Sequence, residues 1–154
     1  MKHLYDMARA LGVSIEHADL TEHDRDGDYC AETNTIRLQQ GMTRRLARSV
    51  LAHELAHAIF GDVPSMFGPV NAKQERRADE WAALRLITRE DYRVAEALHG
   101  GHAPAIAVEL DVMPDIVEAY QRVLLRVGDV VYTRPRMGAG QWDARSYVAS
   151  EHVA

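Results

Sequence analysis

The chain has 154 residues, of which 47% are apolar and 27% are charged, and its net charge is −5 at pH 7. These values are ordinary for one globular domain with at most a small appendage, and they argue against extensive disorder. The acidic balance argues against a protein that mainly coats nucleic acid. The single cysteine, Cys30, excludes an internal disulfide and a cysteine-based zinc ribbon.

The start of the chain and its apolar stretches give no sign of export or of membrane insertion. Residues 1–6 contain no apolar core before a small-residue cleavage site, so we expect no signal peptide. The longest apolar stretch is interrupted by His53, Glu54 and His57, so we expect no membrane span. The expected location is therefore the cytoplasm.

The first forty residues combine one helix with short strands. Apolar residues spaced over 2–11 predict a helix that ends at Gly12. Three segments have the composition and alternation of strands: 13–17, 29–32 and 35–39. The last two flank Thr33 and Asn34, which suit a hairpin turn. We therefore expect a small antiparallel sheet of three strands.

Helical periodicity dominates the chain from residue 44 onward. The predicted helices cover 44–60, 73–87, 88–99, 103–110 and 114–126. A loop is expected over 62–72, because it contains Pro64, Gly68 and Pro69. Beyond residue 128 the periodicity fades, so we expect a partly ordered tail with one strand at Val130–Thr133.

The segment with the clearest chemical meaning is His53-Glu54-Leu55-Ala56-His57. In a helix, histidines at i and i+4 lie one turn apart on the same face, so both imidazoles can reach one metal ion. Glu54 is rotated away by about a third of a turn. From there it can act on a water molecule as a general base without ligating the metal. This pattern is typical of a zinc hydrolase.

A catalytic zinc site also needs a third protein ligand and an open fourth position. Glu75 and Asp79 are again spaced i and i+4, in the next predicted helix. We expect Glu75 to be the third ligand. Asp79 can then accept a hydrogen bond from a ligating histidine, which fixes the tautomer of that histidine.

These residues carry a resemblance to a known family. The chain resembles the ImmA/IrrE metallopeptidases, which are gluzincin-like zinc peptidases. The resemblance lies in a short N-terminal helix, a small three-stranded region that ends at 34–38, the run Ala52–Ala58 and the pattern Glu75-x-x-Ala78-Asp79-x-x-Ala82. The resemblance implies Zn²⁺ held by His53, His57 and Glu75, with Glu54 as general base and Asp79 as an outer partner. It also implies cleavage of a helix-turn-helix repressor, as in induction of a prophage, a mobile element or a stress response.

Several details stay open. The residue that stabilises the oxyanion could be Tyr29, Tyr92, His99 or His102, and strand 35–39 could be the sheet edge that pairs with substrate. The helices at 103–110 and 114–126 have the rhythm of a helix-turn-helix. Acidic residues near the start of the second helix disfavour DNA contact, so we expect packing or repressor docking there.

The overall expectation is an α+β, mostly helical, zincin-like domain with a C-terminal helix-turn-helix-like extension. Its predicted parts are a metallopeptidase domain at 1–88, the helical extension at 89–127 and the tail at 128–154. With no room for a separate sensor domain, we expect control by abundance, metal supply or partner binding. One alternative is a non-catalytic regulatory or binding module with a structural zinc, and another is hydrolysis of a small substrate at the same metal.

Overall fold

The computed structural model describes residues 1–126 and, by their backbone alone, residues 127, 130–135 and 142–147. The chain divides into two compact units, Met1–Tyr120 and Gln121–Ala154. The first unit contains α1 (Lys2–Ala10), β1 (Ser14–Ala18), the 3-10 turn η1 (Thr21–His23), β2 (Gly27–Cys30), β3 (Thr35–Gln39), α2 (Arg44–Phe60), α3 (Gly68–Leu86), α4 (Arg89–His99) and α5 (Ala103–Glu109). Helix α6 (Pro114–Val127) begins in the first unit and ends in the second, which also holds β4 (Val130–Pro135) and β5 (Trp142–Tyr147).

The sheet of the first unit has the order β1-β3-β2, with β1 parallel to β3 and β2 antiparallel to β3. The prediction of an α+β fold is confirmed, but the prediction of a purely antiparallel sheet is wrong. The connection from β1 to β2 leaves a space for one strand between them, and β3 fills this space. Ile36 and Leu38 of β3 are fully buried, so the most apolar strand takes the central place. The prediction that 35–39 is an edge strand is therefore also wrong.

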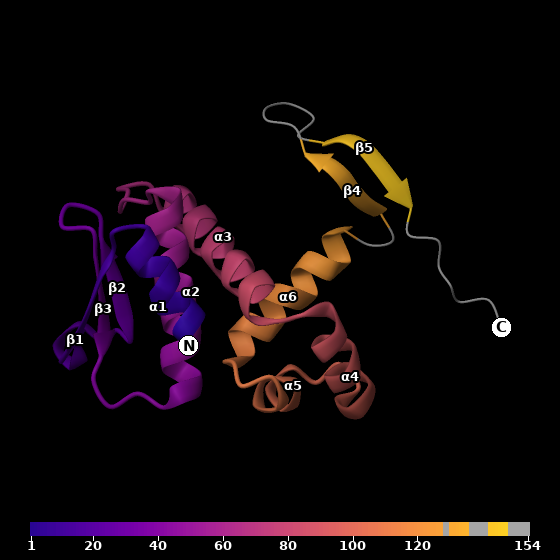
Figure 1. Cartoon of the computed structure of the whole chain (residues 1–154), viewed down its shortest axis with the longest axis horizontal. Helices are drawn as coiled ribbons and strands as arrows, with labels where there is room; N and C mark the ends of the chain where they lie inside the picture. Colours follow the sequence, from indigo (N-terminus) through magenta and orange to yellow (C-terminus); the bar gives the residue numbers. More distant parts are fainter. Residues whose placement is uncertain (128–129, 136–141, 148–154) are drawn as a thin grey trace. The chain divides into compact units, whose positions relative to one another are not determined.

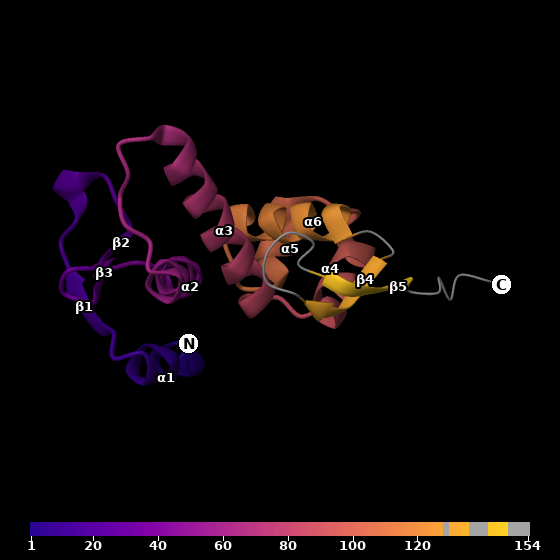
Figure 2. The same cartoon turned by 90° about the horizontal axis from the view of Figure 1, so that it is seen from above.

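Helix α2 lies between the sheet and α3, as both views show (Figures 1 and 2). The side chain of Thr43 caps its N-terminus by accepting a hydrogen bond from the backbone N–H of Leu46, and Gly61 ends it in the left-handed conformation. Leu51 and Leu55 are completely buried in the core that also contains the apolar side chains of β3. This two-sided burial fixes the rotation of α2 about its axis.

Helix α3 starts at Gly68, five residues before the predicted start. Pro69 occupies the first turn of the helix, where its missing N–H costs nothing and its fixed φ favours helix. The side chain of Asn71 then holds the preceding loop, since it exchanges hydrogen bonds of 2.8 and 2.9 Å with the backbone of Ser65. The loop is therefore shorter and better fixed than the sequence indicates.

The turn between α5 and α6 is tied to α2. The guanidinium of Arg48 donates to the carbonyl oxygens of Leu110 (2.9 Å), Asp111 (2.8 Å) and Leu86 (3.1 Å). The buried hydroxyl of Ser49 accepts the backbone N–H of Met113 at 3.0 Å. These bonds satisfy carbonyls at helix ends that would otherwise lack partners. They also fix the start of α6 against the helix that carries the two histidines.

The remaining predictions have mixed outcomes. Helices α5 and α6 lie where expected, whereas a helix-turn-helix role for them and the boundaries of the predicted parts stay predictions. In the second unit β4 and β5 pair antiparallel, and β4 contains the predicted strand. Residues 128–129, 136–141 and 148–154 of the predicted tail lie outside the described residues. Among the described residues, no helix is both long and apolar enough to cross a membrane.

Candidate metal centre

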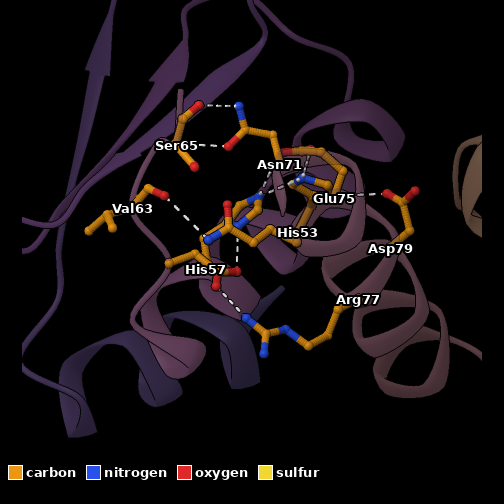
Figure 3. A network of polar contacts seen from close by, with 10 residues as sticks. His53, His57, Val63, Ser65, Asn71, Glu75, Arg77 and Asp79 are labelled. Atoms are coloured by element: carbon orange, nitrogen blue, oxygen red, sulfur yellow. Dashed lines mark hydrogen bonds and ion pairs between the residues drawn. The ribbon is translucent and has the colours of Figure 1, made fainter. Parts of the chain in front are cut away.

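Helix α2 presents His53 and His57 side by side, one turn apart (Figure 3). Their Nε2 atoms are 3.0 Å apart, and the ring centroids are separated by 4.7 Å in an edge-on arrangement. Glu75 reaches the same point from α3, with Oε2 3.2 Å from Nε2 of His53 and Oε1 3.7 Å from Nε2 of His57. The structure thus brings together the three residues that the sequence suggests as ligands.

The other ring nitrogen of each histidine faces a carboxylate. Nδ1 of His53 is 2.9 Å from Oδ1 of Asp79, and Nδ1 of His57 is 3.0 Å from Oδ2 of Asp62. When each Nδ1–H donates to its carboxylate, the lone pairs of both Nε2 atoms are left to converge on one point. The Nε2 lone pairs of the two histidines and the carboxylate of Glu75 then form a site that favours a bound cation.

The spacing of the donor atoms fits a tetrahedral metal site. Ligand bonds of about 2.0–2.1 Å at tetrahedral angles place neighbouring donor atoms roughly 3.3 Å apart. The separations of 3.0, 3.2 and 3.7 Å lie around this value. His53, His57 and Glu75 could therefore hold one metal ion together.

The electrostatics of the metal-free site reflect the same convergence. Burial alone would lower the pKa of His53, but hydrogen bonds with Asp79 and Glu75 outweigh it and raise the pKa to about 10. The pKa of His57 is also raised, because Glu75 and Asp62 outweigh burial. The two imidazoles hold the pKa of Glu75 far below its usual range. A cation, whether proton or metal, is strongly favoured at this point.

Glu54 lies beside the three donors but does not join them. Its side chain is only 8% exposed, and burial raises the pKa of its carboxyl group. Strand β2 approaches it closely, because a Cβ atom on Gly27 would lie 2.5 Å from Cγ1 of Val50 and 3.4 Å from Cγ of Glu54. Glycine at position 27 therefore allows the sheet edge to come up against the carboxylate.

The cleft at this site consists of two chambers of about 420 and 390 Å³. Both are lined by the same five residues, which lie at the junction: Arg25, Gly27, His53, Glu54 and Glu75. One chamber continues toward the start of α6, and the other toward the loop that precedes α3. A peptide that runs through both chambers would thus pass the three metal-donor residues in the middle of the cleft.

Of the four candidates for stabilising an oxyanion, Tyr29 is the one that lines this cleft, and its hydroxyl donates to Asn34. Tyr92 is buried in the core against Tyr120, and its hydroxyl donates to Glu96. His99 and His102 lie at the end of α4 and the start of α5. The proton of the Tyr29 hydroxyl is therefore already engaged by Asn34, and the geometry singles out none of the four candidates.

Sequence reasoning missed Asp62 and Arg77. Asp62 follows the αL residue Gly61 that ends α2, and its side chain is 7% exposed. It accepts from His57 on one side and from the guanidinium of Arg77 on the other, while Arg77 lies over the ring of Phe60 at 4.1 Å. The spacing of five residues from His57 could have pointed to Asp62. No spacing rule points to Arg77, because the contact depends on how α3 packs on α2.

A pair of histidines on one helix, a glutamate on the next and a buried carboxylate beside a cleft define the class of metal-dependent hydrolases. The family model for Peptidase M78, described as the IrrE N-terminal-like domain, matches residues 8–119. The chain therefore belongs to this family, which confirms the resemblance to ImmA/IrrE proteins. The comparison with curated proteins found no match. Membership supports a metallopeptidase-type function and implies a metal.

Metal binding should release protons. At neutral pH His53 of the metal-free protein is protonated, because its pKa is raised to about 10, whereas ligation requires the neutral imidazole. We expect at least about one proton released per metal bound at pH 7.5, with affinity rising from pH 7 to pH 9. Calorimetry of zinc binding in buffers of different ionisation enthalpy measures the number. A heat that does not depend on the buffer would contradict this expectation.

The carboxylate of Asp62 should strengthen metal binding without touching the metal. We expect Asp62→Ala to weaken zinc affinity about 10- to 100-fold, because His57 loses the acceptor that fixes its tautomer. Competition with a chromophoric chelator measures the affinity. Asp28→Ala is the matched control, since Asp28 also pairs with an arginine (Arg37) but contacts no histidine. Equal losses in the two variants would show that Asp62 has no special role.

Proposed function

We propose that this protein is a zinc-dependent endopeptidase. The observation that carries the proposal is the convergence of three donor atoms beside the buried carboxylate of Glu54, in the middle of a cleft that continues to both sides. An enzyme that cuts within a chain needs room for substrate on both sides of the reacting bond. Zinc fits a donor set of two imidazoles and one carboxylate with an open position.

A zinc ion would supply Lewis acidity, which favours attack of water on the scissile carbonyl. His53, His57 and Glu75 would hold the ion, while Asp79 and Asp62 would keep the two rings in the ligating tautomer. A carboxylate oxygen of Glu54 accepts the proton of the attacking water. It then delivers this proton to the nitrogen of the leaving amine. Burial raises the pKa of Glu54 in the metal-free protein, and this favours the protonated form that delivers the proton.

Strand β2 offers a way to align the substrate. Gly27, Asp28 and Tyr29 line the cleft, and within the described residues β2 pairs with a strand on one side only. An extended peptide can add to the other edge through main-chain hydrogen bonds. This role replaces the one first expected for 35–39.

The proposed substrate is a partner transcriptional repressor of the helix-turn-helix type, and the proposed location is the cytoplasm. Both rest on the family resemblance, because a fold by itself does not identify a substrate. Direct nucleic-acid binding is not proposed, since the net charge of the chain is negative.

The alternative is a non-catalytic module in which zinc is structural. A structural zinc usually has four protein ligands, whereas the group found among the described residues has three. A structural zinc would also give no reason to bury the Glu54 carboxylate beside the donors. Both observations favour the enzyme.

The deciding experiment is elemental mass spectrometry of the purified chain combined with a cleavage assay. We expect about one zinc per chain. We also expect cleavage of an unfolded protein such as casein, or of a co-expressed repressor, that a chelator abolishes and added zinc restores. A chain that binds no metal when zinc is supplied would contradict the proposal.

A further inference from the structure

The two chambers of the cleft differ in chemistry. The one toward α6 has four apolar lining residues: Leu46, Val50, Met113 and Ile116. The one toward α3 is lined mainly by polar groups: Asp28, Tyr29, Asp62, Asn71 and Gln74. Polar residues line both chambers, so what distinguishes the chamber toward α6 is this group of four apolar side chains.

The chamber toward α6 begins at Glu54 and the metal-donor residues. Leu46, Val50 and Glu54 are spaced i, i+4 and i+8 on α2, so they form one stripe along the helix. Val50 lies one turn, about 6 Å along the axis, from Glu54. Two residues of an extended chain span about 7 Å, so the stripe meets a side chain within one or two residues of the cut bond.

The opposite wall of the chamber is held firmly in place. Met113 is tied to α2 through the hydrogen bond from its backbone N–H to the hydroxyl of Ser49, and Arg48 donates to the carbonyls of Leu110 and Asp111. Ile116 is 2% exposed and belongs to the core, whereas Leu46, Val50 and Met113 are partly exposed to the cleft. The chamber is thus a preformed site with apolar surface still to be covered.

The charges at the chamber argue against an acidic occupant. Carboxylates of Asp26, Asp79 and Asp115 line it together with Glu54 and Glu75, and these five acidic groups outnumber the two basic lining residues, Arg25 and His53. A carboxylate entering this chamber would face net repulsion. An apolar side chain instead covers the exposed parts of the lining residues.

We propose that this chamber is the specificity site of the enzyme, and that it receives a large aliphatic or aromatic side chain of the substrate next to the bond that is cut. The proposal rests on the endopeptidase function proposed above. It adds to that function the class of sequence that is cleaved. The start of α6 thereby becomes part of the substrate site.

The test uses the zinc-loaded full chain and a peptide library prepared from a digested bacterial lysate. Mass spectrometry identifies the new termini, and zinc-loaded Glu54→Gln serves as the blank. We expect leucine, isoleucine, methionine and phenylalanine to be enriched about tenfold or more at one position beside the cut. Aspartate and glutamate should be depleted there.

Two variants test whether the chamber causes this preference. Met113→Trp and, separately, Leu46→Trp fill it, and we expect cleavage beside large apolar residues to fall about tenfold relative to cleavage beside alanine. Leu98→Trp is the matched control, because Leu98 is exposed on α4 and does not line the cleft. We expect this variant to keep the original preference.

Binding provides a readout that does not need turnover. With zinc-loaded Glu54→Gln and a labelled peptide chosen from the cleaved set, fluorescence anisotropy should show about tenfold weaker binding when the apolar residue is replaced by alanine. This difference should shrink in Glu54→Gln/Met113→Trp. Cleavage that depends on Glu54 but shows no apolar preference overturns the inference alone. Absence of any Glu54-dependent cleavage overturns the proposed function and this inference with it.

Discussion

Glu54→Gln is expected to lower kcat for peptide cleavage by about 100-fold or more while the zinc content stays at about one per chain. Glutamine has nearly the same shape as glutamate, but its amide cannot accept the proton of the attacking water. The carboxylate lies at the junction of the two chambers with only 8% of its surface exposed, so no other group can easily replace it. The loss should appear in kcat, since substrate contacts elsewhere in the cleft are unchanged.

The controls for this variant separate chemistry from folding. Removing a buried charge should leave the free energy of unfolding equal or higher, because burial disfavours the ionised carboxylate. Glu90→Gln, on the exposed face of α4, should keep both activity and zinc. If Glu54→Gln retains full activity with zinc bound, the hydrolytic mechanism is refuted and the structural-zinc alternative takes its place.

The local part of the candidate site could be predicted from the sequence because a helix has a fixed period. His53 and His57 lie on one face of α2 whatever surrounds them, and Glu75 and Asp79 share a face of α3 in the same way. The histidine pair and its spacing from Glu75 then matched a known pattern. That the three residues meet is visible only when α3 packs on α2.

What escaped prediction depends on contacts between distant segments. Strand pairing is set by which apolar strand reaches the centre of the sheet, and alternation alone does not tell a parallel neighbour from an antiparallel one. The early start of α3 escaped because Pro69, read as a loop residue, lies in the first turn of the helix.

The cleft was also beyond sequence reasoning. Met113 lies 59 residues after Glu54, yet both line the same chamber, because Arg48 and Ser49 tie the α5–α6 turn to α2. The turn after α5 and the start of α6 therefore line the cleft. Their apolar residues could be recognised in the sequence, but their position beside the reacting groups could not.

Glu75→Ala is expected to weaken zinc affinity by more than about 100-fold, a larger loss than for Asp62→Ala, because a direct ligand is removed instead of a group behind one. Two histidines one turn apart remain, but without the carboxylate the site has neither its third donor nor the negative charge that balances the ion. Activity should fall with zinc occupancy and recover in part at high zinc concentration. Competition titration and elemental analysis measure the change.

The position of Glu75 makes this variant a clean test. Its side chain is 59% exposed, so its loss leaves the core intact, but the metal-free protein also loses the partner of both imidazoles, and its free energy of unfolding should fall by roughly 1 kcal/mol. Glu75→Asp keeps the charge on a shorter side chain and should give an intermediate affinity, whereas Glu90→Ala should leave it unchanged. If Glu75→Ala binds zinc as tightly as the natural chain, the third ligand is another residue. In that case the metal would have a different set of ligands, and the coordination position open to water and substrate would be a different one.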